Sequence, residues 1–131
     1  MIIFDFDNFK RMNDEYGHLV GDGILSDSSR IISEIVPKQY IFSRWGGEEF
    51  CILLPDTPIE DAYEFAKKLL NVIKDHDFSP AKNVTCSFGV TALIEGDTVL
   101  SLINRADKSL YAAKFQGKNC VVSSFQIMEQ F

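Results

Sequence analysis

The sequence has no hydrophobic run long enough to cross a membrane and little positive charge. No stretch approaches the roughly 20 apolar residues of a membrane-spanning helix, and the amino terminus lacks the features of a secretion signal. Its 13 basic residues are outnumbered by 19 acidic ones, for a net charge of −6. A general nucleic-acid binder would carry a basic face. These absences predict a cytoplasmic protein with no nucleic-acid partner and no direct membrane insertion. The negative net charge does not exclude an anionic small ligand, because Lys10, Lys114 and Lys118 could supply local positive charge.

Cysteine is also scarce. Cys51, Cys86 and Cys120 are an odd number without a CxxC spacing, and each lies in or beside an apolar, strand-like stretch. This pattern disfavours a cysteine metal site or a disulfide framework, and it predicts reduced core residues. With 131 residues the chain has the size of a single domain and can bury roughly two-thirds of its unfolded surface.

The segment IIFDFDNFK at residues 2–10 places two carboxylates, Asp5 and Asp7, at the end of an apolar run. Side chains alternate along a strand, so the two acids share a face and repel each other unless a cation or a shared proton intervenes. Three interpretations stay open. The acids could begin a solvated loop, with Asp7 or Asn8 capping a helix. They could hold Mg²⁺ and, through it, phosphates. One could instead be the nucleophile of a phosphatase similar to the haloacid dehalogenases, although Phe9 stands where that pattern has Thr or Val.

The spacing of apolar residues predicts alternating strands and helices. Strands are expected at 2–6, 39–45, 49–54, 84–94 and 119–125, and helices at 8–18, 20–36, 58–74 and 98–116. Pro37 should end the second helix, Gly46 and Gly47 form a hairpin, Gly89 interrupt a strand and Gly117 end the last helix. This order predicts an α+β fold, a ferredoxin-like βαββαβ palm with an additional αβ unit. Its sheet should be mixed or antiparallel, with helices packed on its faces.

The predicted hairpin, SRWGGEEF, carries a second pair of acids. Glu48 and Glu49 are adjacent, so a regular strand would turn them to opposite sides, and only the turn lets Glu48 aim elsewhere. The two residues should therefore differ in role. In a βαββ arrangement the first strand can end beside this hairpin, which would place Asp5 and Glu48 where a metal could bridge them. Taken alone, GGEE would be interpreted as an exposed acidic tip.

These motifs occur together with others in a fixed order. The segments are DFDNFK at 5–10, Asn13-Asp14, Gly17-His18, Gly21-Asp22, Arg44-Trp45, GGEEF at 46–50, SFGV at 87–90, and Ala106-Asp107 with Tyr111, Lys114 and Gly117. Over nearly its whole length the sequence resembles the GGDEF domains, or diguanylate cyclases. The resemblance predicts one GGDEF domain over residues 1–131 without the helix and DxLTxLxNR-like segment that usually precede the first strand. It also implies an upstream sensory module in the full-length protein.

The resemblance implies a palm-like cyclase that condenses two GTP into cyclic di-GMP and two pyrophosphates. Each domain would bind one GTP, and a homodimer would let each 3′-hydroxyl attack the other α-phosphate. Asp5, Glu48 and the carbonyl of Phe6 would hold Mg²⁺, with Mn²⁺ as a substitute. Glu48 and Glu49 would be catalytic, and Glu49 would assist deprotonation. The alternative is a regulatory domain that binds GTP without turning it over, and the intact signature acids favour the enzyme.

The resemblance also implies substrate contacts, at Asn8, Phe9, Lys10, Asn13, Asp22, Lys114 and Lys118. Asn13 and Asp22 match positions that read guanine, since a carboxylate accepts from N1–H and the 2-amino group and an amide pairs with the purine. The two lysines match positions that bind the triphosphate. Backbone N–H groups of residues 8–10 would cradle phosphates as helix starts do. Without the resemblance, the lysines would equally suit the carboxyl-terminal end of a helix.

Three neighbouring residues are expected to have structural roles. His18 could be interpreted as a general base. It lies in a loop motif, however, where a structural hydrogen bond is the better interpretation. Trp45 and Tyr111 are expected to contribute to packing.

The motif RxxD, through which many family members are inhibited by product, is missing. Its position five residues before the glycine pair holds Pro37, Lys38, Gln39 and Tyr40, so neither the guanidinium nor the carboxylate is present. Feedback inhibition through that site should be absent.

Overall fold

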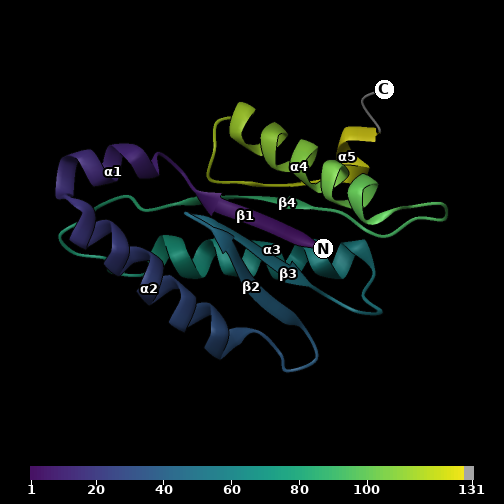
Figure 1. Ribbon diagram of the computed structural model, residues 1–131, viewed down its shortest axis with the longest axis horizontal. Coiled ribbons are helices and arrows are strands. Elements are labelled where there is room, and N and C mark those ends of the chain that lie inside the picture. Colours follow the sequence, from purple (N-terminus) through teal and green to yellow (C-terminus); the bar gives the residue numbers. More distant parts are fainter. Residues whose placement is uncertain (129–131) are drawn as a thin grey trace.

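A five-stranded sheet forms the centre of the protein (Figure 1). The computed structural model describes residues 1–128. The strands are β1 (Ile2–Phe6), β2 (Ile41–Gly46), β3 (Glu49–Leu53), β4 (Cys86–Val90) and β5 (Val121–Ser123), in the spatial order β2-β3-β1-β4-β5. Neighbouring strands are antiparallel except for the parallel pair β4 and β5. This mixed sheet confirms the predicted α+β fold, a ferredoxin-like plan with one added strand.

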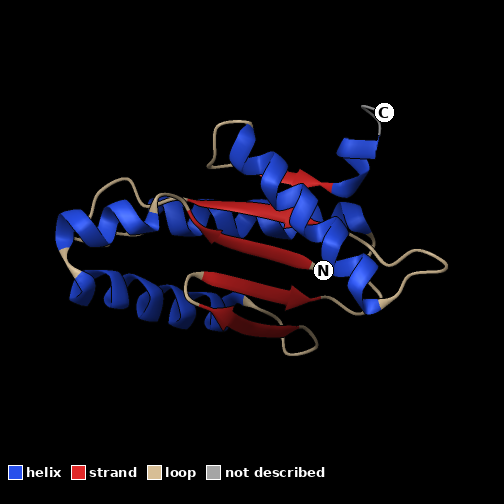
Figure 2. Cartoon of the chain, turned by 45° about the horizontal axis from the view of Figure 1, so that its top comes forward, coloured by secondary structure: helices blue, strands red, loops and turns tan. Residues whose placement is uncertain are grey.

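Helices cover both faces of the sheet (Figure 2). They are α1 (Phe9–Tyr16), α2 (His18–Ile35), α3 (Ile59–Asp75), α4 (Val99–Phe115) and α5 (Ser124–Met128). Successive residues of β1 point to opposite faces. Phe4 belongs to the larger core, with Ile32 of α2 and Leu69 of α3. Ile3 belongs to a smaller core, with Ala106 of α4. The apolar periodicity therefore predicted α2, α3 and α4 correctly, because each buries one face.

Stacked aromatic rings fix β1 between its two neighbours. Phe4 lies opposite Phe50 of β3 and Phe88 of β4 in the strand register. Its ring centroid is 5.2 Å from that of Phe50 and 4.6 Å from that of Phe88. All three side chains are fully buried. Aromatic pairs stabilise beyond the area that they bury, and this stack sets the position of the next residue, Asp5.

The prediction that Gly89 interrupts its strand is wrong. Gly89 lies within β4 and pairs with Ile3. A Cβ atom at this position would lie 2.5 Å from the Leu110 nitrogen and 2.6 Å from the Ala106 oxygen. Both are backbone atoms of α4, so the glycine lets the helix pack directly against the strand. This close approach carries Lys114, one turn further along α4, to the end of β1.

Two strands are much shorter than predicted, and α5 was not predicted. The expected strands at 84–94 and 119–125 are Cys86–Val90 and Val121–Ser123. Lys118 and Asn119 have positive φ angles of 67° and 51°, which places them in a turn before β5. Ser123 ends β5 because its Oγ accepts from the Gln126 N–H at 3.3 Å while its own N–H donates to the Gln126 side chain at 3.0 Å. This reciprocal pair is a capping box that starts α5.

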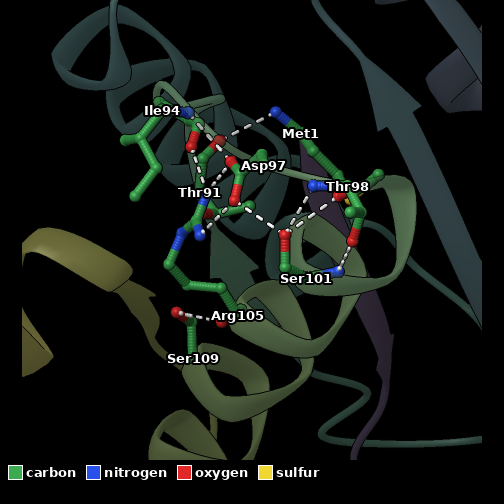
Figure 3. A network of polar contacts seen from close by, with 9 residues as sticks. Met1, Thr91, Ile94, Asp97, Thr98, Ser101, Arg105 and Ser109 are labelled. Carbon is green, nitrogen blue, oxygen red and sulfur yellow. Dashed lines mark hydrogen bonds and ion pairs between the residues drawn. The ribbon is translucent and has the colours of Figure 1, made fainter.

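A polar network fixes the start of α4 at the end of the sheet away from Asp5 (Figure 3). Arg105 of α4 donates to Thr91 Oγ1 at 2.9 Å, to the Ala92 carbonyl at 2.6 Å and to Asp97 Oδ1 at 2.9 Å. The carboxylate of Asp97 also accepts from Ser101 Oγ at 2.8 Å. The loop after β4 is thereby tied to the helix that follows it.

The three cysteines are free thiols, as predicted. Cys51 and Cys86 are buried and Cys120 is half-buried. Within residues 1–128, the helices are all too short or too polar to cross a membrane.

Candidate functional site

Asp5 lies near the end of β1, at the edge of the sheet where β3 and β4 begin. It pairs with Glu49 of β3 on one side and with Ser87 of β4 on the other. Residues directly opposite each other in antiparallel strands share a face, so Asp5 and Glu49 both face the α4 side. The register confirms that the first strand ends beside the hairpin. The residue directly opposite Asp5 is Glu49, whereas Glu48 was the one expected to approach it.

Glycine and a bulge shape the GGEE hairpin. Gly46 and Gly47 have positive φ angles of 146° and 54°. Arg44 Nε donates to the Gly47 carbonyl at 2.8 Å, and the register shift between Arg44 and Gly46 leaves one residue unpaired. Glu48 is half-buried in the turn, and Glu49 begins β3 with an exposed side chain. The two glutamates therefore have different surroundings, as their adjacency predicted.

Acidic side chains gather around Glu49. Although its side chain is exposed, partial desolvation of the Glu49 carboxyl raises its pKa, and the carboxylates of Asp5, Asp107 and Glu48 raise it further. Like charges this near to one another favour a bound cation. Within residues 1–128, no group of three or more acidic, histidine or cysteine side chains is arranged to hold a metal. A cation here would need additional oxygen ligands from the backbone, from a phosphate or from water.

Lys114 of α4 brings a positive charge to these acids. Its Nζ contacts the Asp5 carboxylate and lies 2.9 Å from Asp7 Oδ1 and 3.3 Å from the carbonyl oxygen of Phe6. Burial would lower the pKa of Lys114, but the two carboxylates outweigh this effect and the pKa is raised. Asp5 and the Phe6 carbonyl, two of the three predicted metal ligands, thus form a set of oxygens that binds a cation. The cation present is the ammonium group predicted to bind the triphosphate.

Asp7 is a buried anchor of the site that the sequence did not predict. Its buried carboxylate accepts hydrogen bonds from Ser87 Oγ at 2.6 Å, Thr85 Oγ1 at 2.7 Å, Lys114 Nζ at 2.9 Å and the Asn119 N–H at 3.0 Å. Burial would raise the pKa of Asp7, but these partners hold it below its usual range. The interpretation of Asp7 as a solvated or helix-capping acid is therefore wrong. A usable signal was present, since Thr85 and Ser87 repeat the two-residue spacing of Asp5 and Asp7 in an otherwise apolar segment.

The turn after β1 joins the end of α4. Asn8 has left-handed φ and ψ angles of 56° and 36°, and its side chain makes no capping hydrogen bond to α1. Its Oδ1 instead accepts from Lys118 Nζ at 2.6 Å. The first backbone bond of α1 runs from the Met12 N–H to the Asn8 carbonyl. The N–H groups of Phe9 and Lys10 therefore have no acceptor within the helix, and Lys118 lies beside this turn.

Asn13 and Asp22 come from consecutive helices. Gly17, with φ of 89°, separates α1 from α2. Asn13 is half-buried and its side chain lies against Gly21, while Asp22 is exposed on the next position of α2. The two residues predicted to read guanine therefore lie at the same junction of α1 and α2.

A pocket of about 360 Å³ lies along another side of α1. Its lining includes Asn8, Arg11, Glu15 and Lys82. The pocket lining includes none of the residues predicted to hold the metal or to read the base. The pocket therefore meets the predicted site only at the turn after β1.

The packing roles expected for Trp45 and Tyr111 are wrong. Trp45 is 45% exposed, because the bulge takes it out of the strand ladder. Tyr111 is 72% exposed on the side of α4 that faces away from the sheet. His18 begins α2 with an exposed side chain. The structural hydrogen bond expected of it is not seen within residues 1–128.

The sequence matches the family described as "Diguanylate cyclase, GGDEF domain" over residues 1–120. Response regulator PleD of Caulobacter vibrioides is 38% identical over 127 residues, which cover 92% of this chain and 28% of PleD. Diguanylate cyclase VdcA of Vibrio cholerae is 38% identical over 128 residues, which cover 93% of this chain and 38% of VdcA. The chain therefore spans well under half the length of these relatives.

Solved structures have the same fold. The active GGEEF domain of a diguanylate cyclase from Vibrio cholerae gives a TM-score of 0.87 at 32% identity, over 94% of this chain and 80% of that one. The GGDEF domain of DgcB from Caulobacter crescentus, solved with c-di-GMP, gives a TM-score of 0.87 at 26% identity, over 94% of this chain and 73% of that one. With its GGEEF hairpin beside Asp5 and a family match over most of its length, this chain belongs to the GGDEF family of diguanylate cyclase domains.

Proposed function

We propose that this chain is a catalytic diguanylate cyclase domain that condenses two GTP into cyclic di-GMP and two pyrophosphates, with one GTP per domain across a homodimer. The observation that carries the proposal is the meeting of Asp5, the Phe6 carbonyl and Lys114 opposite the first residue of β3. Oxygen ligands for a cation lie here beside a lysine, which suits a metal-bound triphosphate. Relatives named diguanylate cyclase support the same chemistry.

Asp5, the Phe6 carbonyl and Glu48 would hold Mg²⁺ or Mn²⁺, because hard cations prefer oxygen ligands. The bound ion would supply polarisation of the α-phosphate and charge for the departing pyrophosphate. Lys114 contacts the same oxygens of Asp5 and Phe6. Because an ammonium group and a divalent cation repel each other, Lys114 would leave Asp5 and turn to a triphosphate oxygen. Its contact with Asp7 would keep it nearby.

The turn after β1 would hold the rest of the triphosphate. Lys118 lies beside Asn8, and the N–H groups of Phe9 and Lys10 have no helical acceptor, so together they offer donors to an anion. Glu49 is exposed and lies opposite Asp5. It is therefore open to the 3′-hydroxyl of a nucleotide held by the second domain, and it would accept that proton.

Asn13 and Asp22 would read the guanine at the α1–α2 junction. The exposed carboxylate of Asp22 can accept from N1–H and the 2-amino group, which adenine does not offer together. A site built on such hydrogen bonds rejects the wrong base because its own polar groups would be left unpaired.

The second candidate is a regulatory domain that binds GTP without turnover. The presence of Asp5, Glu48 and Glu49 favours the enzyme. Diguanylate cyclase SiaD from Pseudomonas aeruginosa was solved in complex with its activator SiaC. By analogy, an upstream sensory module or a partner would control this domain, in the cytoplasm where GTP is available.

Incubation with GTP and Mg²⁺ followed by chromatography for cyclic di-GMP tests the proposal. Both this chain and a chain extended at its amino terminus are used. We expect product from the parent and none from Glu49→Gln, while Glu49→Gln still binds GTP in calorimetry. Glu95→Ala, which alters an exposed loop acid, is the matched control and should keep turnover. GTP binding without product in both parent chains would support the regulatory candidate instead.

A further inference from the structure

Gly21 occupies a buried position of α2 that has no room for a side chain. A Cβ atom there would lie 1.8 Å from Asn13 Oδ1, 2.9 Å from Asn13 Cγ and 3.3 Å from Phe9 Cζ. Gly23, two residues further along the same helix, would meet nothing within 4 Å. Glycine makes the interior of a helix less stable than alanine does. At Gly21 the space that alanine would fill is taken by the amide of Asn13.

In this contact Oδ1 is the inward end of the Asn13 amide. Asn13 Oδ1 is buried and has no hydrogen-bond partner within residues 1–128. A buried, unpaired carbonyl oxygen is unfavourable, and this one occupies the space that glycine leaves open at position 21. Nδ2, the other end of the amide, is not among the buried unpaired atoms. The accessible end of Asn13 is therefore a hydrogen-bond donor with no acceptor capacity.

We infer that Gly21 is a positioning residue that sets base selectivity, because its missing side chain seats the Asn13 amide with Oδ1 inward and Nδ2 outward. The inference rests on the proposed GTP site. An outward Nδ2 can donate to the 6-oxo group of guanine, whereas adenine carries a 6-amino donor at that position and would be repelled. Asn13 would then read position 6 of the purine, and Asp22 would read N1–H and the 2-amino group. The two residues divide the recognition between them.

Calorimetric titrations of GTP, ATP and inosine triphosphate with Mg²⁺ test this division in Gly21→Ala and in its control, Gly23→Ala. Gly23→Ala should leave the melting temperature unchanged or raise it, because alanine favours a helix and the position is open. Gly21→Ala should keep the fold by displacing the Asn13 side chain, which is the end of a side chain rather than backbone. Gly21→Ala should lower the affinity for GTP about tenfold, the size of one lost hydrogen bond, and lower that for inosine triphosphate equally. Asp22→Ala should lower the affinity for GTP more than the affinity for inosine triphosphate, because inosine triphosphate lacks the 2-amino group. Gly23→Ala should match the parent.

The steric route is tested by combining the change with Asn13→Ala, which removes the amide that Gly21→Ala would displace. In that background Gly21→Ala should cause no further loss of GTP affinity, and the double variant also relieves the overlap should Gly21→Ala alone fail to fold. If the parent prefers GTP and Gly21→Ala prefers it to the same degree, the inference is overturned while the proposed function stands. Additive losses in the double variant also overturn it. A parent without any GTP preference overturns the proposed function and this inference with it.

Discussion

Asp7 connects more parts of the site than any other single residue described above. Its carboxylate joins β1 to Thr85 and Ser87, to Lys114 of α4 and to the turn at Asn119. The side chain is only 2% exposed. Removing a buried acceptor leaves its donors without partners. Asp7 therefore helps to hold Lys114 beside the Asp5 carboxylate.

We predict that Asp7→Ala lowers the free energy of unfolding by about 2–4 kcal/mol, because four donors lose their acceptor and Lys114 loses a charge partner. Urea unfolding at neutral pH measures the change. The control is Asp14→Ala, which removes an exposed acid of α1 and should alter stability by less than about 0.5 kcal/mol. Equal stability of both variants would contradict the role given to Asp7.

Asp5 and Glu48 are the side chains proposed to hold Mg²⁺. Asp5→Ala and Glu48→Ala should each weaken GTP binding at least about tenfold in the presence of Mg²⁺, because the remaining acid would face the triphosphate without its full metal site. Calorimetry with and without Mg²⁺ measures this, with Glu95→Ala as the control. Affinities that stay at the parent value in both variants would remove the metal from these positions.

Among single residues, those with a distinctive motif were predictable and those defined by distant contacts were not. The residue pattern indicated that Asp5 and the GGEE hairpin lie together, and the strand register agrees. The ion pair of Lys114 with Asp5 could not be predicted, because it joins residues 109 positions apart and depends on how closely α4 packs. The same holds for the burial of Asp7.

At the level of elements, the contact between α4 and β4 depends on Gly89. Gly89→Ala would place a Cβ atom 2.5 Å from the Leu110 nitrogen. Backbone atoms cannot rotate away as a side chain can, so the helix itself must move. We predict a loss of about 2–4 kcal/mol in the free energy of unfolding, and weaker GTP binding because Lys114 moves with α4. Urea unfolding and calorimetry measure the two effects. Gly23→Ala has open space around it, and a similar loss in that variant would contradict the steric cause.

The elements that carry a strong periodic or capping signal were predicted to within a few residues. α3 was expected at 58–74 and runs from Ile59 to Asp75, and α4 begins after the capping box of Thr98 and Ser101. α5 was missed because its 5 residues are too few to show a helical period. β5 was predicted too long because Lys118 and Asn119 form a left-handed turn before it and Ser124 begins α5 directly after it.

For the molecule as a whole, the network around Arg105 links stability to pH. Asp97 accepts hydrogen bonds from Arg105, which has the largest effect, and from the Ile94 N–H. These bonds hold the pKa of Asp97 well below its usual range. A lowered folded-state pKa contributes stability above the unfolded-state value of about 3.9, and this contribution is lost as the pH falls through the folded value. Asp97→Asn should therefore be less stable than the parent at pH 7, and the difference should shrink below about pH 4. Urea midpoints across this range decide it. A difference independent of pH would show that the carboxylate charge is not responsible.

The region that carries the inhibitory motif in other family members has a packing role in this chain. Tyr40 is half-buried and its ring packs edge-on against Phe65 of α3, with centroids 5.7 Å apart. Its N–H donates to the Pro37 carbonyl at 3.0 Å, which closes the turn before β2. An aromatic side chain engaged with α3 cannot serve as the carboxylate of RxxD, and Pro37 offers no guanidinium.

We therefore predict that an active, amino-terminally extended chain shows no inhibition by cyclic di-GMP that is traceable to residues 37–40. Product should inhibit only by occupying the GTP site, so raising the GTP concentration should relieve the inhibition completely. Turnover assays that titrate cyclic di-GMP at several GTP concentrations measure this. Non-competitive inhibition that disappears in Lys38→Ala or Gln39→Ala would contradict the prediction. The variant Pro37→Arg with Tyr40→Asp should gain non-competitive inhibition. It should also lose about 1–3 kcal/mol of stability, because the Tyr40 ring leaves its contact with Phe65.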